Sequence, residues 1–174
     1  MATIFDLIDA GDADGVRRLL AQDPGAAAQK DEQGLTVVMR AAYRGMTDVV
    51  LESDPPLEPF DRIVVGKSDG LPAPDAWTPD GFTPLHIAAF VDNVDAARKL
   101  LDAGADPDAV ATASFARVTP LGTCSFAGSL DVAKVLLEHG ADPRIGEDGE
   151  YTAEAEAIAR GNEELAALIR QHTA

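Results

Sequence analysis

The sequence contains little of what several classes of protein require. Its 174 residues include one cysteine, Cys124, so an internal disulfide is excluded and a reducing, cytoplasmic location is expected. No apolar run reaches the roughly 18 residues of a membrane span, and no basic residue precedes the short apolar stretch at the N-terminus, so neither a membrane anchor nor a secretory signal is expected. Lys and Arg total 14 against 30 Asp and Glu, a formal net charge of -16. This balance disfavours nucleic acid as a partner, because phosphate contacts need clustered positive side chains.

Aromatic residues are also scarce: six Phe, two Tyr and one Trp make up 5% of a chain that is 46% hydrophobic. A core of this composition depends on Ala, Leu, Val and Ile, which suit closely packed helices. We therefore expect an all-α fold in one domain, since the length is that of a single domain. The acidic residues are spread along the chain, which is typical of a solvated surface and could also steer a basic partner.

The main positive signal is self-similarity at a nearly fixed period. Four segments begin with an equivalent threonine, at Thr36, Thr83, Thr119 and Thr152. The last two intervals are 36 and 33 residues, whereas the first is 47. Nine residues after each threonine, a tight turn between helices favours a residue that tolerates positive φ. These positions hold Gly45, Asp92, Gly128 and Gly161, with Gly11 one period earlier.

A second apolar segment closes each unit and ends at a glycine suited to a left-handed helix cap, at Gly104 and Gly140. The unit is therefore helix, turn, helix and capped loop. Pro84 and Pro120 follow their threonines at a first helical turn, where the missing N–H costs nothing.

This unit resembles the ankyrin repeat. The segments that carry the resemblance are DGFTPLHIAAF at 80–90, LLDAGADP at 100–107, TPL at 119–121 and VLLEHGADP at 135–143. The resemblance covers about four fifths of the chain and implies an ankyrin-repeat solenoid of about five to six helix-turn-helix repeats with loop or hairpin connections. It also implies that His86 is a structural residue that hydrogen-bonds between repeats.

The markers divide a single ankyrin-repeat domain, residues 1–174, into unequal parts. We expect an N-terminal cap repeat at 1–34, repeats at 35–53, 80–109 and 110–142, a C-terminal cap repeat at 143–174, and a degenerate Pro-rich repeat or insertion at 54–79. Two interpretations of this last segment stay open. It is either an insertion of 14 residues or a truncated central repeat, in which residues 57–67 form a shortened first helix ending at Gly66 and the second helix is deleted. We favour the truncated repeat, followed by a loop ending near Trp77.

Three features look chemical and are better explained structurally. Gly66-Lys67-Ser68 resembles the end of a phosphate-binding loop, but Asp61 stands where that loop needs its other glycine. The segment 12–15 resembles part of a calcium loop, yet alanines occupy its first and last ligand positions, so we expect Asp12 to cap a helix. Cys124 takes an alanine position on a packed helix. The sequence therefore predicts no enzyme, no metal and no cofactor.

Function in a repeat stack usually lies on the face of the first helices and on the loop tips. Three units place an aromatic residue two positions before the turn, at Tyr43, Phe90 and Phe126. The remaining predicted partner-binding residues are neighbours of this series or lie at loop tips: Arg44, Trp77, Phe82, Val91, Phe115 and Tyr151. The rings either form an exposed docking stripe or pack inward, and periodicity alone does not separate the two.

The leading interpretation is a monomeric protein-interaction module that binds another protein, one with some basic surface, and carries out no catalysis. One alternative is a regulatory or catalytic subunit that uses the carboxylates of the central segment, Asp54, Glu58, Asp61, Asp69 and Asp75. Another is a self-associating structural solenoid.

Overall fold

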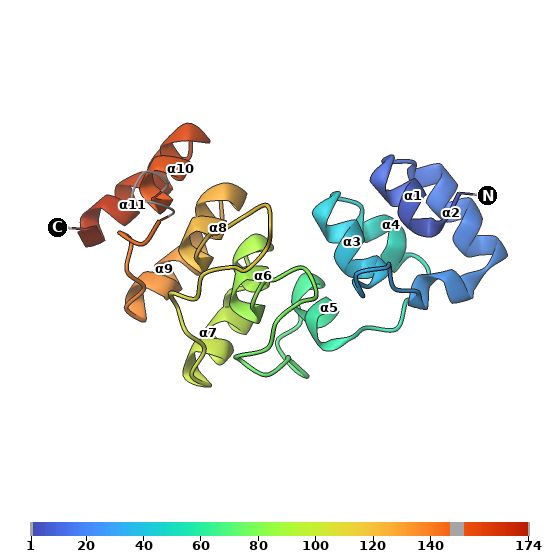
Figure 1. Cartoon of the computed structure of the whole chain (residues 1–174), viewed down its shortest axis with the longest axis horizontal. Coiled ribbons are helices and arrows are strands. Elements are labelled where there is room, and N and C mark those ends of the chain that lie inside the picture. Colours follow the sequence, from blue (N-terminus) through green and yellow to red (C-terminus); the bar gives the residue numbers. More distant parts are fainter. Residues whose placement is uncertain (1, 147–151, 174) are drawn as a thin grey trace.

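The regular structure of the chain is helical, which confirms the predicted all-α solenoid. The computed structural model describes residues 2–146 and 152–173, and within them eleven α-helices follow one another as antiparallel pairs (Figure 1). We call the first helices of the pairs, together with the unpaired α5, the first row: α1 (Ile4–Asp9), α3 (Val37–Tyr43), α5 (Pro59–Val64), α6 (Pro84–Phe90), α8 (Pro120–Ala127) and α10 (Ala153–Ala159). The second row contains α2 (Ala13–Gln22), α4 (Thr47–Leu51), α7 (Val94–Asp102), α9 (Leu130–Glu138) and α11 (Glu163–Thr173), and a short 3-10 turn, η1 (Pro24–Ala28), follows α2.

The first-row helices start where the threonines predict. Thr36 Oγ1 accepts the backbone N–H of Met39 at 3.0 Å, and Thr119 Oγ1 accepts that of Gly122 at 3.1 Å. Each bond satisfies one N–H that the start of a helix leaves without a partner. Asp12 caps α2 in the same way through the Gly15 N–H, at 2.8 Å, as predicted.

The predicted turn residues all have positive φ, including the one that is not glycine. Gly45 has a φ of 66° and Asp92 a φ of 53°. An L residue rarely adopts this conformation, although aspartate tolerates it better than most. The Asp92 carboxylate also accepts the backbone N–H of Val132, at 3.1 Å, so this strained turn is tied to the start of the next second-row helix.

The two rows differ in the middle of the chain. In the first row, α5 contacts α3 on one side and α6 on the other. In the second row, residues 65–83 form no helix, so α4 and α7 are not joined by an intervening element. The loop after α5 is instead tied to α7, because the Asn93 side chain donates to the Ile63 and Lys67 carbonyls, both at 3.0 Å.

The hydrophobic core is divided at the same place. One cluster of buried side chains fills the N-terminal part, from Ile4 to Val50. The other includes Leu35 and Met39 and extends through Ile63 to Ile169. The helix α5 therefore links an N-terminal unit to a larger C-terminal one.

A side chain at Gly81 would collide with the backbone of a neighbouring loop. The φ of Gly81 is +95°, and a Cβ there would lie 2.6 Å from the Ala113 backbone nitrogen in the loop of the next repeat. Gly45 has a φ of +66° and open space around its Cα, so it is a matched control. We expect Gly45→Ala to lower the free energy of unfolding by about 1 kcal/mol and Gly81→Ala by about 2–4 kcal/mol, measured by urea denaturation. Equal losses would contradict the close packing of these two loops.

Candidate functional site

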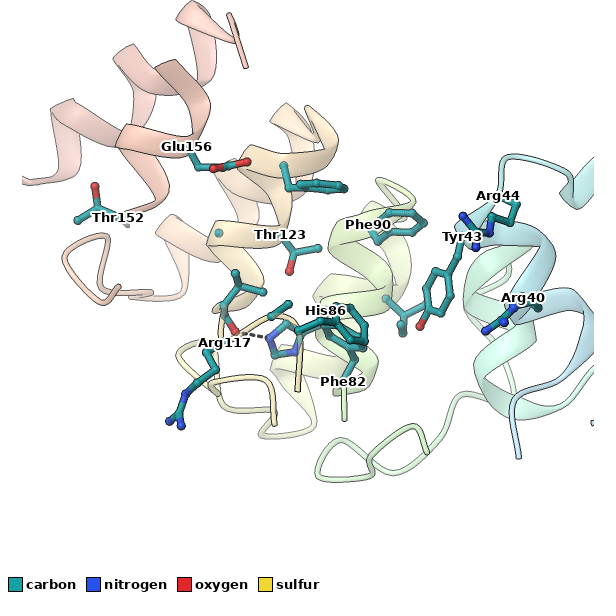
Figure 2. Close-up of a pocket in the computed structure, with 16 residues that line it drawn as sticks. Arg40, Tyr43, Arg44, Phe82, His86, Phe90, Arg117, Thr123, Thr152 and Glu156 are labelled. Atoms are coloured by element: carbon teal, nitrogen blue, oxygen red, sulfur yellow. Dashed lines mark hydrogen bonds between the residues drawn. The ribbon is translucent and has the colours of Figure 1, made fainter. Parts of the chain in front are cut away.

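A groove of about 540 Å³ lies along the first row and is the candidate site. Its walls come from α3, α6, α8 and α10, together with the loop that precedes α8. Figure 2 shows the rings of Tyr43, Phe82 and Phe90 gathered between α3 and the C-terminal helices. The groove therefore spans four helix pairs and crosses the place where the second row is interrupted.

The rings in the groove are packed in pairs. Tyr43 and Phe90 meet edge to face with centroids 5.7 Å apart, and Phe82 lies 5.9 Å from Phe115. Such aromatic pairs contribute about 0.5–1.5 kcal/mol beyond the area they bury. At the other end, the Arg160 guanidinium lies 4.0 Å from the centroid of the Phe126 ring, a cation–π contact.

Exposure separates these rings into two groups. Tyr43, Phe82 and Phe90 are half-buried, and Tyr43 and Phe82 pack against the larger core cluster. Phe126 and Phe115 keep 49% and 74% of their surface exposed. Tyr43 and Phe82 therefore pack inward, whereas Phe115 and Phe126 are exposed to solvent.

The groove collects six of the predicted partner-binding residues: Tyr43, Arg44, Phe82, Phe90, Phe115 and Phe126. Two others lie elsewhere. Trp77 is 45% exposed in the loop before α6, and Val91 is half-buried at the end of α6. Tyr151 is outside the described residues. A binding role for all nine stays a prediction.

His86 forms part of the groove wall and holds adjacent repeats together. It is 1% exposed, and its Nε2 donates to the Val118 carbonyl at 2.9 Å. Since that carbonyl can only accept, Nδ1 is left to accept the Thr83 hydroxyl, at 2.7 Å. Burial lowers the pKa of His86 to about 4, so the ring is neutral near pH 7. The structural role implied by the TPLH motif is confirmed.

Arginines are concentrated in this groove. Arg40 and Arg44 both bind Asp9, at 2.7 and 3.1 Å, and Arg40 also lies 3.7 Å from Asp31. The hydrogen bond from Arg40 outweighs the effect of burial and, with that from Arg44, lowers the pKa of Asp9. Figure 2 places Arg117 on the opposite side of the rings from Arg40 and Arg44.

Sequence reasoning missed Arg40 and Arg117 as groove residues. Arg40 had a usable signal, because it lies four residues before Arg44 and so on the same face of α3. Arg117 had none, since its position depends on how the irregular loop before α8 folds.

Asp61 and Asp69 of the central segment are bound by other residues of the chain. Asp61 is fully buried and accepts the Thr36 hydroxyl, at 2.5 Å, and the Glu58 backbone N–H. Burial raises the pKa of Asp61. Asp69 is exposed and pairs with Arg62 at 2.6 Å. Across residues 2–146 and 152–173, no three His, Cys, Asp or Glu side chains converge in a way that could hold a metal ion.

Cys124 is a poor nucleophile in this setting. It is buried on α8, and burial raises the pKa of its thiol well above the ordinary value. A thiol that stays protonated lacks the thiolate needed for nucleophilic attack.

None of the helices described is long and apolar enough to cross a membrane.

Comparison with known proteins identifies the repeats. Residues 80–112 and 118–147 match the family model for the ankyrin repeat. These segments contain α6, α7, α8 and α9, the helices whose threonines, turns and glycine caps are most regular. A comparison with curated proteins gives no match.

Proposed function

We propose that this chain, which is an ankyrin-repeat protein, binds another protein through the groove on its first row of helices. Ankyrin repeats are in general protein–protein interaction modules and are typically not catalytic. The observation that carries the proposal is the exposure of Phe115 and Phe126 at a groove that is already formed. Burying such rings against a partner stabilises a complex by about 1–3 kcal/mol each.

The continuous first row supports the same proposal. We infer that residues 54–79 hold a repeat reduced to its first helix, because α5 fills the place between α3 and α6. An insertion would leave α3 and α6 as direct neighbours and would loop out from the stack. No residue of α5 lines the groove, which reaches from α10 to α3 through the contact of the Phe90 ring with the Tyr43 ring.

The other parts of the proposal follow from composition and are less specific. A monomer in a reducing, cytoplasmic compartment, without catalysis, is consistent with the single buried Cys124 and the strongly acidic surface. A net charge of -16 favours long-range attraction of a partner with a basic surface. The acidic central segment is a weaker candidate, because Asp61 and Asp69 are already bound to other residues of the chain.

The test is a pull-down from the source lysate with matched variants. Phe115→Ala with Phe126→Ala removes the exposed rings of the groove. Val110→Ala with Ile158→Ala removes two apolar side chains outside it, which are 36% and 55% exposed. We expect the groove variant to bind the partner at least tenfold more weakly, a loss of about 1.4 kcal/mol or more of binding free energy, while the control variant retains the partner. Circular dichroism verifies that both variants are folded, and equal retention by both would refute the groove as the binding surface.

A further inference from the structure

We propose that the segment seated in the groove is an apolar peptide stretch flanked by Asp or Glu side chains. The inference rests on the proposed protein-binding function and gives the chemistry of the partner at that same site. It differs from what the net charge of the chain would favour.

The charged residues of the groove differ from those of the chain as a whole. The chain has 14 Lys and Arg against 30 Asp and Glu, whereas the groove is lined by Arg40, Arg44 and Arg117 against Glu156 alone. Screening limits the influence of distant surface charge to about 10 Å at 0.1 M salt. A ligand inside the groove therefore responds to these side chains more than to the acidic exterior.

Three of the carboxylates near the groove already have partners in the same chain. Glu156 accepts Arg160 at 2.8 Å, and Asp9 is shared by Arg40 and Arg44. Asp31, a further neighbour of Arg40, accepts the N–H groups of Gln33 and Leu35, both at 2.9 Å. Asp80 also lies near Arg40 and Tyr43, but its free Oδ1 is buried. An incoming Lys or Arg would have to displace one of these partners or reach that buried oxygen.

Guanidinium donors, in contrast, remain available. Arg44 is 51% exposed and bonds Asp9 only through Nε, which leaves its terminal N–H groups without a partner among the described residues. Arg117 has no acidic partner within the part of the chain that the structure covers. Planar guanidinium groups bind carboxylates through paired N–H···O bonds, so each is a site for an Asp or Glu of the ligand.

The floor between these arginines accepts an apolar side chain. Gly122 on α8 stands three residues after its capping threonine, the position that His86 occupies on α6. Because the glycine has no side chain, the wall is open beside Thr123 and Phe126. A Cβ at Gly122 would meet its nearest neighbour at 3.5 Å, an ordinary contact, so a larger residue can be placed there to block the groove.

The experiment selects random displayed peptides on the full chain and retains those that Gly122→Leu no longer binds. Synthetic copies of these peptides are then titrated by fluorescence anisotropy. We expect them to carry Asp or Glu beside aromatic or aliphatic residues. We also expect Arg44→Gln and Arg117→Gln each to weaken binding about tenfold, while Arg98→Gln on α7, outside the groove, has no effect.

The outcomes separate this inference from the function on which it depends. Groove-dependent peptides with basic or uncharged flanks, or peptides that are insensitive to both arginine substitutions, would overturn the acidic-flank inference and leave protein binding in place. If no selected peptide depends on the groove and the pull-down shows no partner lost with Phe115 and Phe126, both proposals fail. Thermal melting of Gly122→Leu must match the parent chain, and Gly122→Ala, which lines the groove without filling it, serves as the folded control that keeps binding.

Discussion

Ile63→Ala is expected to lower the free energy of unfolding by about 2–5 kcal/mol, the range for removing a large aliphatic side chain from a core. Ile63 is fully buried on α5, the helix between the two core clusters, and belongs to the larger cluster. Its backbone carbonyl also accepts Asn93 from the start of α7. Val64→Ala on the same helix removes a half-buried side chain and is expected to cost less than half as much.

The same variant tests whether α5 couples the two parts of the solenoid. Stability in repeat proteins depends on contacts between neighbouring repeats, so weakening one interface uncouples the units on either side. Urea unfolding of Ile63→Ala should give a midpoint by circular dichroism that differs from the midpoint by fluorescence of Trp77, the single tryptophan. If the two probes give the same midpoint, and that midpoint equals the one of the parent chain, α5 is not needed to join the N-terminal unit to the rest.

The second large effect is a loss of stability on mild acidification, caused by His86. Its pKa is about 4 in the folded chain and about 6.5 when unfolded. As the pH falls through 6.5 the unfolded state takes up a proton that the folded state does not. The stabilisation is therefore complete above pH 6.5 and is lost progressively down to pH 4. Between pH 7 and pH 5 the expected loss is about 2 kcal/mol.

The pH effect is measured by comparing the parent chain with His86→Gln. Other groups titrate in both proteins: Asp9, whose pKa is lowered, loses its contribution only at more acidic pH, and Asp61, whose pKa is raised, acts in the opposite direction. The difference between the two proteins isolates the histidine. His86→Gln should be less stable at pH 7 but nearly insensitive between pH 7 and pH 5, whereas parallel curves would show that His86 does not titrate as its burial requires.

Much of the fold follows from local chemistry that the sequence displays. The threonines, the prolines after them and the turn residues each make a backbone hydrogen bond or adopt a dihedral angle that their own chemistry favours. Even Asp92 could be placed, because its position in the repeat equals that of the turn glycines. The N-terminal cap of α5 differs from those of the other first-row helices, because it is formed by Glu58 and Asp61 and contains no threonine.

The candidate site was less predictable, for physical reasons. The repeat register aligns Tyr43, Phe90 and Phe126, but exposure depends on what the neighbouring helix presents. Phe126 remains exposed beside Arg160, whereas Phe90 is partly covered by Tyr43. The contact of Phe115 with Phe82 depends on an irregular loop, for which periodicity gives no information. The charge of the groove could not be inferred from a total of -16 either, since it results from two arginines at α3 and one in the loop before α8.

The claim that the first-row groove is the binding surface is tested most directly by amide chemical-shift mapping of the labelled chain with a captured partner or a selected peptide. We expect the largest perturbations at residues 40–44, 115–118 and 122–126, which come from three separate elements and meet only in the groove. Perturbations confined to residues 53–79, or to α7 and α9 in the second row, would contradict the claim and move the site to the central segment or to the opposite row of helices.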